Sequence, residues 1–150
     1  MVHEQTWAAM KSRPYVWGTF VWNMFDFAVS TRHEGGIPGR NDKGLVTYDR
    51  KTKKDAFYFY KANWSEELVL YIADRRFSER TNAVTDIKIY SNAGSVELVV
   101  NGRSLGYHRN VMNDVFIWKK VTLRPGENQV TARAERGAQK FNDDCTWTLK

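Results

Sequence analysis

Seven short candidate strands follow one another between residues 68 and 149, and few folds can accommodate such a series. Turn signals separate them, and their sequences are LVLYIAD, VTDIKIYSN, SVELVVNG, RSLGYHR, VFIWKKVTL, NQVTARAE and KFNDDCTWTL. Ile87 and Ile89 flank Lys88, which is the spacing of a strand with one buried face. Short alternating strands at this density predict an immunoglobulin-like β-sandwich for residues 66–150.

Turn chemistry supports this interpretation. Asn101-Gly102 lies between two of the segments and predicts a type I′ hairpin, because both central residues of that turn need a positive φ. Pro125-Gly126 predicts another turn. The chain has 150 residues and is 42% hydrophobic, which suits one ordinary domain or two small ones with a core.

The first 65 residues follow a different pattern. HEQTWAAMKSR predicts a helix that ends before Pro14, and residues 55–64 predict a second helix. Between them, residues 15–27 (YVWGTFVWNMFDF) are almost continuously apolar, as in a strand covered on both faces. A loop rich in glycine and proline follows. One strand with one helix cannot bury that strand, so residues 1–65 are expected to be either the end of a larger barrel or sheet or a piece that assembles with other chains.

Charge and residue usage exclude several classes of function. The formal net charge of +6 is spread along the chain, and the densest run, RKTKK at 50–54, is interpreted as a solvated helix entrance. This argues against a nucleic-acid partner. Cys145 is the only cysteine, so no intrachain disulfide can form. The cysteine usage therefore does not indicate the cellular compartment of the protein. The three histidines lack metal-site spacing, and we expect neither metal nor cofactor.

The sequence also gives no indication of a membrane partner. Residues 14–29 are too short for a span and carry Asn23 and Asp26. The first residues, MVHEQTWAAMK, lack the apolar core of a signal peptide.

Two stretches carry a family resemblance. WGTFVWNMFDF and NDKGLVTYDRKTKKDAFYFYKANW resemble the last strand, loop and helix of the catalytic barrel in glycoside hydrolase family 2, which includes β-galactosidases, β-glucuronidases and β-mannosidases. VTDIKIYSNAGSVELVVNGRSLG and LRPGENQVTARA are similar to the immunoglobulin-like domain that follows that barrel. The resemblance covers practically the whole chain. It implies a mixed fold: the terminal βα segment of a (β/α)8 TIM barrel at 1–65, then an all-β immunoglobulin-like sandwich at 66–150.

The resemblance also implies a sugar site, because barrel sites form at the C-terminal ends of the strands. Trp22 looks like the family tryptophan that lines the innermost sugar subsite, although a core tryptophan is the alternative. Asp26 is expected to hydrogen-bond either a loop or the sugar, and Glu34 in HEGG is placed where it could touch substrate.

Asn41 and Lys43 form an Asn-x-Lys motif that resembles the one by which β-glucuronidases hold the C6 carboxylate of glucuronic acid. Lysine supplies a compact charge with three donors, and asparagine adds a directional donor. A β-galactoside, or another sugar removed from a chain end, stays open as the substrate.

The resemblance implies that the two catalytic glutamates of a retaining exo-β-glycosidase lie upstream of residue 1. None of the acidic residues before the sandwich matches them, so we expect no catalytic residue here and no activity from the chain alone. The implied partners are a carbohydrate substrate and the rest of the barrel. The alternative is a non-catalytic carbohydrate-binding or structural module, with Trp118 and Trp147 either forming an external platform or packing in the core.

Overall fold

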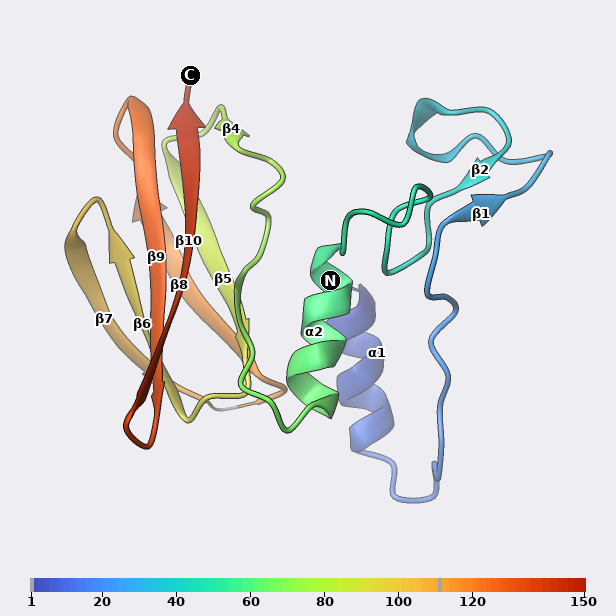
Figure 1. Ribbon diagram of the computed structural model, residues 1–150, viewed down its shortest axis with the longest axis horizontal. Coiled ribbons are helices and arrows are strands. Elements are labelled where there is room, and N and C mark those ends of the chain that lie inside the picture. Colours follow the sequence, from blue (N-terminus) through green and yellow to red (C-terminus); the bar gives the residue numbers. More distant parts are fainter. Residues whose placement is uncertain (1, 111) are drawn as a thin grey trace. The chain divides into compact units, whose positions relative to one another are not determined.

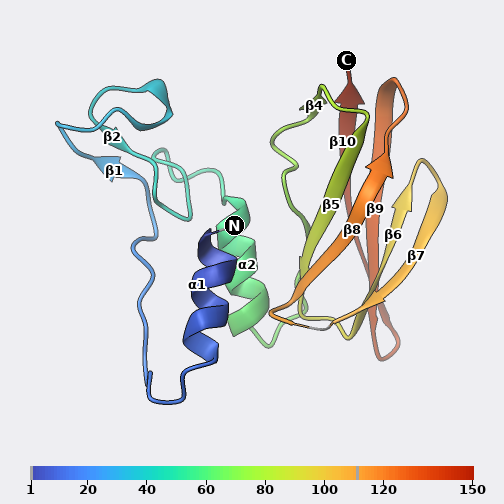
Figure 2. The same cartoon turned by 180° about the vertical axis from the view of Figure 1, so that it is seen from behind.

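The computed structural model describes residues 2–110 and 112–150. The chain divides into two compact units, Met1–Tyr58 and Phe59–Lys150, and helix α2 (Asp55–Trp64) contains the boundary between them. The long strands all belong to the second unit (Figures 1 and 2).

The first unit contains little regular structure. Helix α1 (Val2–Lys11) and helix α2 confirm the two predicted helices. Strands β1 (Phe27–Ala28) and β2 (Arg40–Asn41) pair antiparallel, and the 3₁₀ turn η1 (Glu34–Gly36) lies in the loop between them. Each α-helix has ten residues, and no helix in the described part of the chain is long and apolar enough to cross a membrane.

The strand predicted over residues 15–27 is largely absent, and only its last residue, Phe27, enters β1. Four aromatic side chains along this run are 74–101% exposed: Tyr15, Trp17, Phe20 and Trp22. A strand forms by hydrogen bonding to neighbours, and within the described residues the pairing of this run is confined to its end, in a parallel bridge between Phe25 and Val46 and the pairing of Phe27 in β1. The strands of the described residues therefore do not confirm the barrel segment expected for residues 1–65.

The second unit is a β-sandwich. Its five-stranded sheet has the order β4 (Glu79–Arg80), β10 (Gln139–Leu149), β9 (Gly126–Arg136), β6 (Ser95–Val100), β7 (Arg103–Arg109). Its three-stranded sheet has the order β3 (Leu70–Ile72), β5 (Val84–Ser91), β8 (Val115–Thr122). All seven predicted strands are confirmed; the two-residue β4 was not predicted. Asn101 and Gly102 have φ values of 52° and 79°, as the predicted β6–β7 turn requires.

The sandwich core is built from the inward-facing positions of both sheets. Ile87 and Ile89 from one sheet, and Val96 and Leu98 from the other, are fully buried in one apolar cluster. Trp118 and Trp147 belong to the same cluster, at 4% and 1% exposure. Core packing is therefore confirmed for both tryptophans, and an external platform built from them is wrong.

An acidic side chain closes one edge of the sandwich. Asp143 on β10 accepts a hydrogen bond from the backbone N–H of Ile72 at 2.7 Å and forms an ion pair with Arg75. The Arg75 guanidinium also lies over the Tyr71 ring, 4.5 Å from its centre. These contacts join β3 of the small sheet to β10 of the large sheet.

Candidate functional site

The candidate site is the loop of the first unit that contains Asn41 and Lys43, and a buried carboxylate fixes its base. Asp26 Oδ1 accepts hydrogen bonds from the backbone N–H of Gly44 at 2.9 Å and from Lys54 Nζ at 2.6 Å. The side chains of Asp26 and Lys54 are 3% and 16% exposed. Lys54 also donates to the carbonyl of Asp42 at 2.9 Å. Asp26 thus binds the loop, which is one of the two roles expected for it.

The same loop lies directly against the end of the apolar run. Leu45 N–H donates to the Asn23 carbonyl at 3.0 Å, and Val46 N–H donates to the Met24 carbonyl at 2.9 Å. A Cβ on Gly44 would lie 2.1 Å from the backbone nitrogen of Asp26. Because backbone atoms cannot move aside easily, this close approach requires glycine at position 44.

Asn41 orients the backbone at Lys43. Asn41 is 4% exposed, and its side-chain Oδ1 accepts a hydrogen bond from Lys43 N–H at 3.0 Å, which is an Asx-type turn. Its partner across β1 and β2 is Phe27. The Lys43 side chain is exposed. The buried amide therefore fixes the turn that presents the ammonium group to solvent.

Glu34 supports the other side of the loop. It accepts a hydrogen bond from Asp42 N–H at 2.8 Å and forms an ion pair with Arg32 at 2.9 Å. The hydrogen bond from Asp42 N–H is the main cause that lowers the pKa of Glu34, and the positive charges of Arg32 and Lys43 add to it. Asp42 in turn pairs with Arg40 through two contacts of 2.5 and 2.9 Å.

Trp22 lies beside this loop. Its ring is 74% exposed and meets the Phe27 ring edge-on, with 6.0 Å between the ring centres. Since side chains of paired residues emerge on the same side of a two-stranded ladder, Phe27 and Asn41 are neighbours. Trp22, Asn41 and Lys43 are thus linked through Phe27 and the Asx turn. Asp26 and Glu34 hold the loop through hydrogen bonds from the backbone N–H groups of Gly44 and Asp42.

Lys54 is the main residue that the sequence interpretation missed. It was included in the solvated run RKTKK, and that interpretation is wrong for this residue because its ammonium group is engaged by Asp26. Its position directly before helix α2 gave no signal, since a lysine there is usually solvated. The neighbouring Lys51 and Lys53 are exposed, as predicted.

The acidic side chains near the loop are occupied by structural contacts. Asp26 pairs with Lys54, Asp42 with Arg40, and Asp49 accepts a hydrogen bond from Thr47 at 2.6 Å. Across residues 2–110 and 112–150, no group of three His, Cys, Asp or Glu side chains is arranged to hold a metal ion. The loop therefore offers binding groups: an exposed indole, an exposed ammonium and a buried amide.

Comparison with known proteins gives consistent matches. A β-glucuronidase of Bacteroides fragilis is 45% identical over 149 residues, which is 99% of this chain and 21% of that protein. The crystal structure of an FMN-binding β-glucuronidase from Faecalibacterium prausnitzii L2-6 superposes with a TM-score of 0.88 at 41% identity, covering 99% of this chain and 22% of that one. β-Galactosidase BoGH2A of Bacteroides ovatus is 25% identical over 96% of this chain and 17% of its own length.

A model described as a domain of unknown function (DUF4982) matches residues 82–140, inside the sandwich. The chain spans about a fifth of the length of the relatives it matches. Over nearly its whole length, the chain is therefore similar to one segment of larger proteins that are β-glucuronidases and β-galactosidases.

Proposed function

We propose that this chain is the closing segment of the catalytic barrel of a retaining exo-β-glycosidase, followed by an immunoglobulin-like domain. The observation that carries the proposal is the exposed aromatic run of residues 15–24, which ends beside the braced Asn41–Lys43 loop. Apolar side chains of this size are seldom left in water without a partner. The other strands of a barrel would cover the run and bring the catalytic glutamates to the same mouth.

In this proposal the chain binds and orients the sugar, and the rest of the enzyme performs the chemistry. The Trp22 ring packs against the C–H face of the sugar in the innermost subsite. The Lys43 ammonium group contacts the edge of the sugar, and Asn41 fixes the backbone of Lys43. Asp26 and Glu34 keep the loop in place, so they act as positioning residues.

We further propose that the sugar is a β-glucuronide. An ammonium group matches the C6 carboxylate of glucuronic acid, whereas a neutral galactose would leave that charge without a counter-ion. The names of the B. fragilis and F. prausnitzii proteins support this choice. The name of the B. ovatus protein supports the galactoside alternative, at lower identity.

The test uses a longer enzyme that contains this segment, assayed on nitrophenyl β-glucuronide and β-galactoside. Lys43→Met removes the charge and keeps the length of the side chain. A charge-assisted hydrogen bond contributes about 1.5–3 kcal/mol, so kcat/KM for the glucuronide should fall about 10- to 100-fold. Turnover of the galactoside should not change. Equal loss on both substrates, or no loss, would reject the glucuronide assignment.

The proposed contact between the Trp22 ring and the sugar is tested separately. Trp22→Ala should raise KM for either sugar. Trp17→Ala should affect stability more than KM, because alternation along a strand of the completed barrel would place Trp17 on the face opposite to Trp22. The 150-residue chain alone should hydrolyse neither substrate; turnover by the isolated chain would contradict the proposal.

A further inference from the structure

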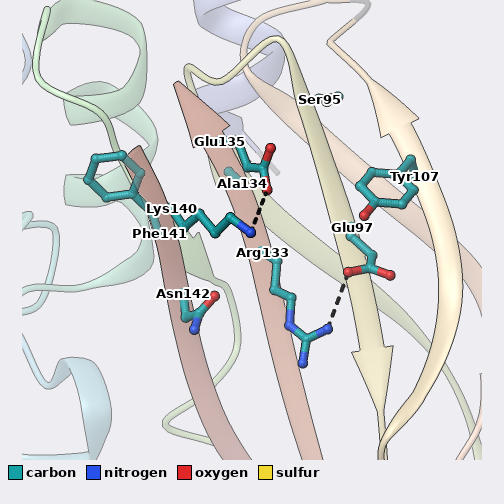
Figure 3. A pocket seen from close by; sticks show the side chains of 9 residues that line it. All are labelled: Ser95, Glu97, Tyr107, Arg133, Ala134, Glu135, Lys140, Phe141 and Asn142. Carbon is teal, nitrogen blue, oxygen red and sulfur yellow. Dashed lines mark hydrogen bonds and ion pairs between the residues drawn. The ribbon is translucent and has the colours of Figure 1, made fainter. Parts of the chain in front are cut away.

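The five-stranded sheet carries a hollow on its outer face, away from the core. Along β6, Val96, Leu98 and Val100 point into the core, so Glu97 and Val99 point outward. Both outward residues are nevertheless buried, at 8% and 5% exposure. Side chains from the neighbouring strands surround Glu97 and line a hollow of about 470 Å³ (Figure 3). That volume is within the usual range for small-ligand sites, about 300–1,000 Å³.

Strand register sets the floor of this hollow. Tyr107 and Arg133 are the partners of Glu97 on either side, and Asn142 is the next partner of Arg133. These four side chains therefore form one row across β7, β6, β9 and β10. Adjacent strands are about 4.8 Å apart, so the row is about 14 Å long, more than a single sugar ring needs.

Polar contacts hold the centre of the row in place. Glu97 accepts a hydrogen bond from Ser104 Oγ at 2.6 Å and pairs with Arg133 at 3.5 Å. Arg133 lines the hollow and keeps 53% of its side chain exposed, so its guanidinium still has donors open to solvent. The Tyr107 ring at the end of the row is 70% exposed. A fixed carboxylate, a guanidinium with open donors and an exposed ring thus line the same cavity.

The charges around the hollow cancel. Glu97 and Glu135 face Arg133 and Lys140, and Lys140 pairs with Glu135 at 3.7 Å (Figure 3). A site for a nucleic acid or an anionic membrane carries an excess of positively charged side chains, and a site for an apolar ligand is lined by apolar side chains. Side chains that both donate and accept, next to one exposed ring, match a neutral ligand with many hydroxyl groups.

We propose that this hollow is a second carbohydrate-binding site, specific for a neutral oligosaccharide. The Tyr107 ring packs on one sugar, and Glu97, Arg133 and Asn142 hydrogen-bond the hydroxyls of that sugar and the next. The site lies wholly within the sandwich. It therefore stands independently of the glycosidase site proposed for the first unit.

The test is an NMR titration of the 150-residue chain with cellohexaose, xylohexaose and mannohexaose, and with a heparin hexasaccharide as the charged comparison. At least one neutral hexasaccharide should give saturable shifts of the amides of Glu97, Tyr107, Arg133 and Asn142. Tyr107→Ala should weaken this binding at least about tenfold, the effect of losing one ring contact with its buried area. Phe77→Ala is the matched control, because Phe77 is also exposed, at 63%, and does not line the hollow.

Three results would overturn the proposal. They are an absence of shifts with every neutral sugar at millimolar concentration, tighter binding of the heparin hexasaccharide, and equal binding by the two variants. Unchanged amide signals from the sandwich core would show that Tyr107→Ala is folded. Shifts confined to residues 22–43 would report the other site and would count as an absence of shifts in the hollow, the first of these results.

Discussion

Replacing Asp26 by alanine should release the candidate loop. The variant leaves the Gly44 N–H without its acceptor and leaves the Lys54 ammonium, 16% exposed, with only a carbonyl partner. Breaking a buried ion pair by removing one member costs about 3–5 kcal/mol, and the partial exposure of Lys54 places this pair at the lower end. A cost of about 3 kcal/mol corresponds to a change of about 100-fold in the equilibrium for local opening.

Native-state hydrogen exchange measures this opening residue by residue. The protection factors of the Leu45 and Val46 amides should fall about 100-fold in Asp26→Ala. If the free energy of loop opening is below about 3 kcal/mol in the unaltered protein, these amides should lose all protection. Asp26→Asn, which keeps an acceptor for Gly44 but removes the charge, should give a smaller loss. Asp49→Ala is the control, since that carboxylate is exposed. Unchanged protection of Leu45 and Val46 in Asp26→Ala would refute the conclusion that Asp26 holds the loop in place.

Three further predictions concern the two units. Asp143→Ala should destabilise the sandwich by about 1–3 kcal/mol, because the Ile72 N–H and Arg75 lose their shared acceptor; urea unfolding followed by tryptophan fluorescence measures it, and an unchanged midpoint would contradict it. Burial raises the pKa of the Cys145 thiol from 9.0 to about 11, so the native thiol should react slowly with a disulfide reagent at neutral pH and quickly in urea; equal rates would show that the thiol is accessible. The same shift means that stability is lost as the pH rises above 9.0 toward 11. The pKa of Glu34 is lowered from 4.5, chiefly by the hydrogen bond from Asp42 N–H, so its contribution to the loop is present above 4.5 and lost as the pH falls through the lowered value. The NMR shift of the Asp42 amide should follow that titration. A shift that does not change with acid would contradict the proposed contribution of Glu34 to the loop.

The sandwich could be predicted from the sequence because each strand carries its own signal. Ile87 and Ile89 show the buried face by alternation alone, and Asn101-Gly102 identifies its turn by the backbone angles it must adopt. The packing of Trp118 and Trp147 follows from the same alternation once the strands are placed. Two-residue strands such as β4 are too short to give a period.

The first unit was harder to predict because its contacts join residues distant in sequence. Asp26 and Lys54 are 28 positions apart, and nothing near either residue identifies its partner. The apolar composition of residues 15–27 predicts a buried strand. Composition indicates that such a strand needs neighbours on both faces, but it does not show whether this chain supplies those neighbours. Trp22 and Asn41 were recognised through family resemblance, and the link between them through Phe27 emerged only from the folded chain.

The most direct test of the account compares glucuronide with galactoside in a longer enzyme that carries this segment. The ratio of kcat/KM for nitrophenyl β-glucuronide to that for nitrophenyl β-galactoside should favour the glucuronide in the unaltered enzyme and fall about 10- to 100-fold in Lys43→Met. A ratio that is the same in both enzymes would mean that Lys43 does not touch the sugar, and that the loop of residues 41–44 is not part of its binding site.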